Sequence, residues 1–285
     1  DYAGTFATYN LTIDRNGSKL SGETDNFAVS IDNTSLTIVY VDGTQGWIPT
    51  EEGTGALVVP PAFVVATGGT PCAGSISGDY RIHKFTGPGT FQVTCAGNAN
   101  GSNTVDYMVV AGGGGTHAGG SGASGGGGGG GWRASSGAAS GCYTAGPAPL
   151  TGPVSALPVS VTPYAISVGG AGAGGPGPSA TRGGDSIFSC ITSTGGGVPT
   201  SLSCSCAPGG SGGGGKTCAP ERCGSAGNTP PVSPPQGNPG GDGDKSPPSP
   251  GPSYVGAGGG GATAVGGDGS IPGGYGGVGG AGATS

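Results

Sequence analysis

The chain has 285 residues, of which 72 are glycine and 25 are proline, and its formal net charge is −6. Glycine and proline make up about a third of the residues. Without a collagen repeat, such a share ordinarily indicates disorder, because too little apolar surface remains to offset chain entropy. The composition excludes a helical domain and a doubly wound α/β domain, so any ordered fold must use glycine as a structural unit.

The glycines are unevenly distributed: 15 fall in residues 1–110 and 57 fall in residues 111–285. This break divides the chain into four predicted parts. They are an N-terminal β module at 1–50, a linker at 51–78, the β-sheet start of a glycine-rich domain at 79–111, and the glycine-rich domain proper at 112–285, with Cys/Pro-rich loops.

In the N-terminal module, partial alternation of apolar and polar residues predicts strands at 9–13, 27–31 and 36–41. The dipeptides Asn16-Gly17 and Asp42-Gly43 are strong hairpin turn signals. A module of about 50 residues buries little surface alone. We therefore expect neighbouring copies of the chain to complete it, most simply in a homotrimer.

The middle of the chain predicts further strands. A short candidate lies at 62–66 inside the linker, and residues 80–85 and 90–93 are expected to form a hairpin through Gly87-Pro88-Gly89. The nearly continuous apolar run at 105–111 is typical of a central strand. Two later β-like stretches lie at 159–168 and 186–191.

Beyond residue 111 the sequence contains uninterrupted glycine runs, at 112–115, 125–131, 212–215 and 258–261. Polyproline-II geometry has three residues per turn and directs every backbone N–H and C=O outward. Side-by-side helices of this kind can bond one another where no Cβ intervenes. The runs therefore predict a bundle of polyglycine-II helices, and the alternative is extended coil held by disulfides. The expected fold class is all-β plus non-regular: a small β module, a small antiparallel sheet and this bundle.

Several motifs resemble the glycine-rich domains of tailed-bacteriophage fibres. Tyr80–Phe91 reads YRIHKFTGPGTF and Val105–Gly115 reads VDYMVVAGGGG. Tyr164–Gly175 reads YAISVGGAGAGG, and Gly183–Phe188 with Thr192–Gly197 resembles a later element of the same domains. The N-terminal stretches Leu11–Ser18, Ile38–Asp42 and Gly46–Trp47 are similar to β modules in fibres of phages that infect marine cyanobacteria.

The resemblance implies a virion appendage, usually a trimeric tail fibre or its tip adhesin. Some such adhesins stack polyglycine-II helices and present variable loops to a host receptor. The implied partners are other virion proteins on the N-terminal side and a host surface glycan or outer-membrane protein. The high cysteine and proline content of residues 190–253 departs from the pattern of the family.

The even number of cysteines favours disulfides formed outside the cytosol. The eight are Cys72, Cys95, Cys142, Cys190, Cys204, Cys206, Cys218 and Cys223. Cys72 and Cys95 flank the expected hairpin and form the best candidate pair, whereas the other six allow 15 connectivities. Zinc binding by the last four is the weaker alternative, because their spacing departs from C-x2-C.

The sequence favours neither catalysis nor a cofactor. His83 is expected to be a half-exposed sheet residue, and nothing in the sequence places His117 beside Asp185 and a serine. Asp242-Gly243-Asp244 lacks the rest of a calcium loop and is expected to be a solvated turn. We therefore expect no enzyme activity, no metal and no cofactor.

Exposed aromatic side chains are the natural candidates for receptor binding, because they offer large contacts at low entropy cost. The candidates are Trp132, Arg133, Tyr143, Tyr254 and Tyr275. The alternative is that they cap the ends of the glycine bundle or cover a neighbouring subunit.

The function expected from these features is adhesion by a structural virion protein located in a fibre or appendage of the particle. The alternatives are a passive cell-surface glycine-rich protein and a head-attached fibre without a receptor role. Scattered acidic residues argue against a depolymerising tailspike enzyme. The sequence has no basic stripe for nucleic acid and no apolar run long enough for membrane insertion.

Overall fold

The computed structural model describes residues 1–52, 61–98, 101–118, 123–135, 155–176, 179–199, 207–216, 223–243, 255–271 and 275–283. The chain divides into two compact units, one made of Asp1–Val65 with Cys95–Asn103 and the other of Ala66–Thr94 with Thr104–Ser285. The described residues form short strands and irregular extended chain, with no helix long and apolar enough to cross a membrane. The expected all-β plus non-regular fold class is confirmed.

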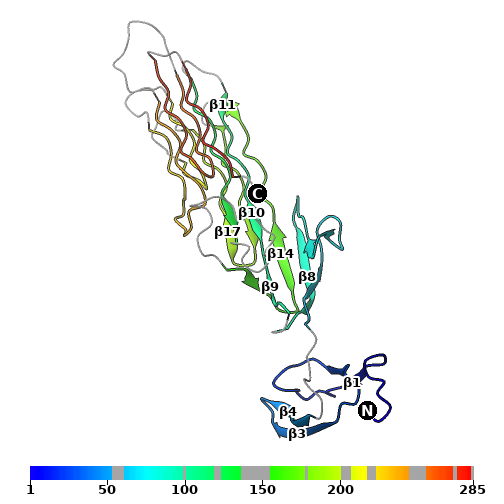
Figure 1. Ribbon diagram of the computed structural model, residues 1–285. Coiled ribbons are helices and arrows are strands. Elements are labelled where there is room, and N and C mark those ends of the chain that lie inside the picture. Colours follow the sequence, from blue (N-terminus) through cyan, green and yellow to red (C-terminus); the bar gives the residue numbers. More distant parts are fainter. Residues whose placement is uncertain are drawn as a thin grey trace. The chain divides into compact units, whose positions relative to one another are not determined.

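Two hairpin-like pairs dominate the first unit (Figure 1). They are formed by β1 (Leu11–Ile13) with β2 (Phe27–Val29) and by β3 (Leu36–Asp42) with β4 (Gly46–Glu52), both antiparallel. Each of the three predicted strands is present. Asn16 and Gly17 both have positive φ, 44° and 85°, as a type I′ turn requires.

The first unit has a small apolar core. Leu20 and Phe27 are each 1% exposed, and Ile13 and Trp47 pack against them. In the β3–β4 hairpin, the backbone N–H groups of Gln45 and Thr44 donate to the Asp42 carboxylate and lower its pKa.

Most of a five-stranded sheet in the order β17-β16-β14-β8-β5 belongs to the second unit; the division assigns the first two residues of β5 and the last two of β8 to the first unit. Its strands are β5 (Val64–Thr67), β8 (Gly89–Ala96), β14 (Pro163–Ser167), β16 (Ser186–Phe188) and β17 (Ile191–Ser193). The two-stranded pairs are β6 (Ser75–Ser77) with β7 (Tyr80–Ile82), β9 (Thr104–Val105) with β13 (Leu157–Pro158), β10 (Met108–Val110) with β12 (Trp132–Ala134), and β11 (His117–Ala118) with β15 (Gly175–Pro176).

An aromatic cluster stabilises the sheet. The ring of Phe91 on β8 lies 5.9 Å from that of Phe188 on β16, at 90°, and 6.5 Å from that of Tyr164 on β14. Tyr107 contacts Phe188 with a ring separation of 6.4 Å. Edge-to-face pairs of this kind contribute about 0.5–1.5 kcal/mol beyond the burial of their area. The motifs at 80–91, 105–115 and 164–175 thus supply one shared core.

The pairing predicted for this region is wrong. Residues 80–85 do not pair with 90–93: β7 pairs with β6, and β8 pairs with β14. The Lys84 carbonyl accepts from Thr70 N at 2.8 Å, so the chain turns away after β7. The short strand candidate at 62–66 overlaps β5, in which Ala66 is buried, and β6 also lies in the segment predicted as a linker.

The expected central strand at 105–111 is also wrong, because it breaks into β9 and β10. The break is stabilised by Ser135, whose hydroxyl donates to the Asp106 carboxylate at 2.6 Å and accepts from Tyr107 N at 3.1 Å. Ser135 N also donates to the Tyr107 carbonyl at 3.0 Å. These bonds replace the ladder and turn the Tyr107 ring inward. Its burial raises the pKa of Tyr107, and the charge of Arg133 partly opposes the rise.

The glycine runs bond their neighbours at steps of three residues. In segment 125–131, Gly126 N donates to Ala257 O at 2.8 Å and Gly129 N donates to Gly260 O at 3.0 Å. The same step of three joins this segment to three further neighbours. Its Gly128 and Gly131 N–H groups donate to the carbonyls of Gly197 and Thr194. The N–H groups of Gly214 and Ser211 donate to the carbonyls of Gly126 and Gly129, and those of Gly114 and Ala111 donate to the carbonyls of Gly128 and Gly131. A β-strand pairs in one plane with period two, whereas a period of three with four neighbours is polyglycine-II packing.

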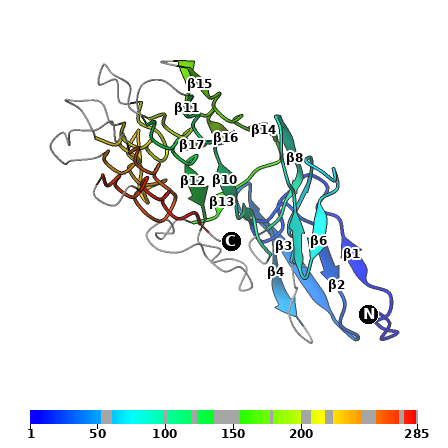
Figure 2. The same cartoon turned by 90° about the horizontal axis from the view of Figure 1, so that it is seen from above.

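In the second unit the segments run alongside one another in Figure 1, and Figure 2 views the same bundle closer to its end. All described glycines with positive φ lie at or before Gly97. Glycine in the bundle therefore serves close approach and not unusual backbone angles. A Cβ on Gly128 would overlap the carbonyl oxygen of Ser211.

Small polar side chains fill the remaining interior of the bundle. Ser211 and Ser225 are fully buried, and their hydroxyls donate to Gly261 O at 3.1 Å and to Val198 O at 3.2 Å. This interior is held by backbone hydrogen bonds, each contributing about 0.5–1.5 kcal/mol net.

Candidate functional site

The structure places Trp132 inside the bundle and not in an exposed loop. Trp132 follows segment 125–131 directly, begins β12 and is 6% exposed. It forms a cluster with Ala134 and Ala262, and Ala283 packs against this cluster. The burial of Trp132 argues against an exposed contact and agrees with the alternative that this side chain caps one end of the bundle, because its indole is enclosed where three segments end. Arg133 points to the opposite side of β12 and is half-buried.

Tyr275 is the one receptor candidate that the described residues show as strongly exposed, at 75%. Its backbone N–H and C=O pair with Ser270 at 3.3 and 3.2 Å. Tyr143 and Tyr254 lie outside the described residues.

Trp132 and Tyr275 lie at opposite ends of the bundle. Gly277, two residues after Tyr275, donates to Gly256 O at 2.9 Å, and Gly126 donates to the adjacent Ala257. Trp132 lies six residues further along its segment than Gly126, or about 19 Å at a rise of ~3.1 Å per residue. The structure therefore does not join the two aromatics in one site.

Several described segments end near Tyr275, where hydrogen bonds such as Gly215 N to Gly241 O at 2.8 Å hold them. Asp242 and Asp268 also lie at this end, where Asp268 Oδ1 accepts from Asp242 N at 2.8 Å.

Gln236 joins three parts of the bundle at the Trp132 end, and the sequence analysis did not identify it. Its side chain is fully buried: Oε1 accepts from Thr194 N at 2.8 Å, and Nε2 donates to Pro230 O at 3.1 Å. Its carbonyl accepts from Trp132 N at 2.9 Å. One glutamine in a proline-rich stretch gives no sequence signal of burial.

Replacing Gln236 with leucine should lower the free energy of unfolding by about 2–4 kcal/mol, because Thr194 N–H and Pro230 C=O would lose their partners in a buried site. Urea denaturation measures the loss. The matched control is Gln45→Leu, at an exposed position of the first unit. Equal losses in the two variants would contradict the role of Gln236.

Four of the eight cysteines lie in the described residues. Cys72, Cys95, Cys190 and Cys223 are free thiols, so the expected Cys72–Cys95 pair is not formed. The predicted hairpin that would have placed them together does not exist. Cys142, Cys204, Cys206 and Cys218 lie outside the described residues. In the described part of the chain, no three His, Cys, Asp or Glu residues gather as metal ligands.

The two histidines are separate from the acidic candidates. His83 Nδ1 lies 2.8 Å from Gly68 O, and its ring packs edge-on against Phe91 at 5.3 Å. Both ring nitrogens of His117 are buried without a hydrogen-bond partner. Asp185 accepts from Gly195 N at 2.8 Å, and Asp242 accepts from Gly224 N at 3.0 Å.

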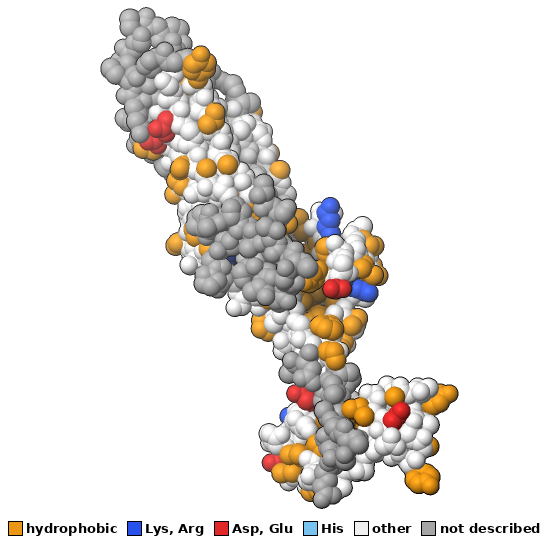
Figure 3. Space-filling view, viewed as in Figure 1, with side chains coloured by type: hydrophobic (Ala, Val, Ile, Leu, Met, Phe, Trp, Pro, Cys, Tyr) orange, Lys and Arg blue, Asp and Glu red, His pale blue; other side chains and the backbone are white. Residues whose placement is uncertain are grey.

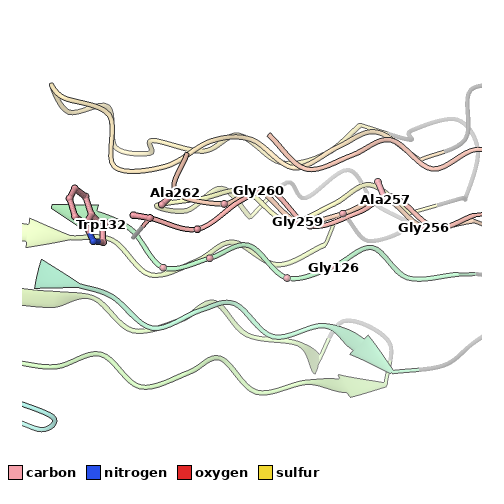
Figure 4. Close-up of a pocket in the computed structure, with 18 of the residues that line it drawn as sticks. Gly126, Trp132, Gly256, Ala257, Gly259, Gly260 and Ala262 are labelled. Carbon is pink, nitrogen blue, oxygen red and sulfur yellow. The ribbon is translucent and has the colours of Figure 1, made fainter. Parts of the chain in front are cut away.

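A groove of about 940 Å³ runs along the bundle. Glycine-rich segments 123–130, 255–262 and 276–283 line it, together with Met108, Val110 and Trp132. Figure 4 shows Trp132 at one end, near Ala262, and Gly126 with Gly256 toward the other end. The lining consists mainly of backbone, so the groove offers peptide groups and very few side chains.

The family described as a glycine-rich domain matches residues 85–285, which cover most of the second unit. The chain belongs to this family. Neither the curated proteins nor the solved structures gave a match. The glycine-rich domain thus includes β8, the aromatic core and the entire described bundle.

The surface of the glycine-rich domain carries few charges. In the view of Figure 3, its described part is mostly backbone and small side chains, with scattered hydrophobic groups. The exposed groups of its described part are therefore mainly backbone, together with the Tyr275 ring and scattered apolar side chains such as Val265 and Val278.

Proposed function

We propose that the chain is a structural component of a bacteriophage fibre or appendage, and that its glycine-rich domain recognises a receptor on the host cell surface. The motif resemblance supports this proposal. The observation that carries it is the bundle itself: a framework of backbone-bonded segments holds the exposed Tyr275 ring at one end. Such an arrangement suits presentation of variable contacts from a rigid support.

The proposed mechanism is adhesion without bond chemistry. Tyr275 offers an exposed aromatic face that can stack on a sugar ring or an apolar side chain. The proposed receptors are a surface glycan or an outer-membrane protein, and the proposed location is the virion.

The first unit is the proposed attachment side, where the chain would meet other virion proteins and form a homotrimer. Val39, Tyr40 and Val41 of β3 are 46%, 49% and 55% exposed, so both faces of this strand carry exposed apolar groups. Contiguous apolar surface of this kind favours burial by a neighbouring chain.

Tyr275→Ala should reduce binding of the labelled full chain to intact host bacteria at least about tenfold, because it removes the exposed aromatic contact. Flow cytometry against a panel that includes marine cyanobacteria measures the effect. Tyr9→Ala is the matched control, because Tyr9 has the same 75% exposure in the first unit.

Unchanged binding by the Tyr275 variant would exclude a contact role for that ring. Absence of binding by the unmodified chain to every cell type, together with its absence from particles in immunogold electron microscopy, would favour the passive cell-surface alternative.

A further inference from the structure

The groove is bordered by three glycine segments of which only the middle one bonds to both others. Segment 255–262 receives bonds from Gly126 and Gly129 on one side and from Gly277 and Gly280 on the other. Among the described residues, no backbone bond joins segment 123–130 to segment 276–283. These two segments therefore stand as walls on either side of segment 255–262.

Each of the three segments has one row of backbone N–H groups without a partner in the described part of the chain. The rows follow the same step of three residues: Gly127 and Gly130; Gly256, Gly259 and Ala262; Gly276, Gly279 and Gly282. All eight residues line the groove. Intervening N–H groups, such as those of Gly126 and Gly260, are bonded inside the bundle.

The walls also leave carbonyl groups without an N–H donor. Within the described residues, the C=O groups of Gly127, Gly130, Gly276 and Gly279 accept no hydrogen bond. The Gly127 oxygen lies against the backbone of Gly259, so the acceptors open to a bound chain are chiefly those of Gly276 and Gly279. The donor rows repeat every three residues, or about 9 Å along the groove.

Among the described segments, one neighbour of segment 255–262 is also missing. A threefold helix has three rows of N–H and three rows of C=O, and so has six bonding directions. Bonds join this segment to five neighbours, which contain Gly126, Gly212, Asn238, Gly267 and Gly277. The sixth direction is the unpaired row that faces the groove.

We propose that the groove holds a polyglycine-II segment from a second copy of this chain, and that segment 276–283 supplies it. A chain satisfies these rows at bundle spacing when its peptide groups repeat every three residues and the row that faces the groove is glycine. Segment 276–283 lies at the edge of the bundle and has such a row, Gly276, Gly279 and Gly282, all exposed, whereas its Cβ-bearing residues Val278, Ala281 and Ala283 lie outside that row. The contact extends the bundle between copies and does not depend on the attachment role.

Substitution at Gly279 tests the contact. A Cβ on Gly279 meets no atom of its own chain within 4 Å, and the same holds for Gly282 and for Gly170, which lies outside the groove. Gly279→Leu and Gly282→Leu should therefore fold but obstruct the groove. Gly170→Leu is the matched control.

The readout is amide hydrogen exchange of Gly127, Gly130, Gly256 and Gly259 in the full chain, with sedimentation run on the same samples. We expect self-association to slow the exchange of these amides. In the wild-type chain and in Gly170→Leu, exchange in the self-associated state should be at least about tenfold slower than in the same chain diluted to the monomer. In both groove variants the protection should be lost.

Fast exchange in the wild-type chain at every concentration would overturn the proposal. So would protection in a strictly monomeric chain, or protection that survives both groove substitutions. A wild-type chain whose groove amides are protected but which binds no host cell would contradict the proposed function and leave the proposed groove contact intact.

Discussion

Gly128→Ala should destabilise the glycine-rich domain by about 3 kcal/mol or more, because the bundle has no space for a methyl group at this position. Gly128 is buried, donates to Gly197 O at 2.9 Å and accepts from Gly114 N at 2.8 Å. The new Cβ would overlap the Ser211 carbonyl, so a backbone segment bonded on several sides would have to shift. Thermal and urea unfolding measure the loss.

Gly113→Ala is the matched control, because a Cβ on Gly113 has only one neighbour within 4 Å, Gly128 O at 3.7 Å. Its effect should lie between neutral and a gain of about 0.4–1 kcal/mol, since alanine restricts the unfolded chain. Equal effects of the two substitutions, with no loss in Gly128→Ala, would show that the runs serve as flexible coil and not as close-packed helices.

Trp132→Ala should reduce the free energy of unfolding by about 3–5 kcal/mol, as expected for removing a large buried side chain. The indole fills the space between β12, Ala262 and Ala283, and little of the bundle interior is apolar enough to replace it. Trp132→Phe should lose less, because part of the volume remains. Denaturation of the full chain measures both variants.

Tyr275→Ala should leave the unfolding midpoint unchanged, which makes it the exposed aromatic control for Trp132. A Trp132→Ala chain with wild-type stability but without host binding would restore the receptor role that the buried position argues against.

The local signals in the N-terminal module were sufficient for its secondary structure. Alternation predicted β1, β2 and β3, and Asn16-Gly17 predicted a turn whose two positive φ angles the structure shows. These elements depend on neighbouring residues, so they can be identified without knowledge of distant contacts.

Predictions that required a choice of partner failed more often. Residues 80–93 had the pattern of a hairpin, yet β7 pairs with β6 and β8 pairs with β14, which follows more than 60 residues later. Residues 105–111 had the pattern of one strand, yet the hydroxyl of Ser135 divides it. Several partners satisfy the same local pattern, and packing of Phe91, Tyr164 and Phe188 selects among them.

The sequence by itself determined that glycine must be the packing residue, because the chain has too few apolar side chains for an ordinary core and places its glycines in runs. The tertiary structure alone decided which segments touch and that Trp132 and Gln236 are buried. It also decided that one row of N–H groups in each groove segment has no partner among the residues that the structure describes. The physical reason is that the glycine runs carry no side chains that would distinguish one run from another. Their register and neighbours depend on backbone bonds between distant segments, which no local pattern specifies.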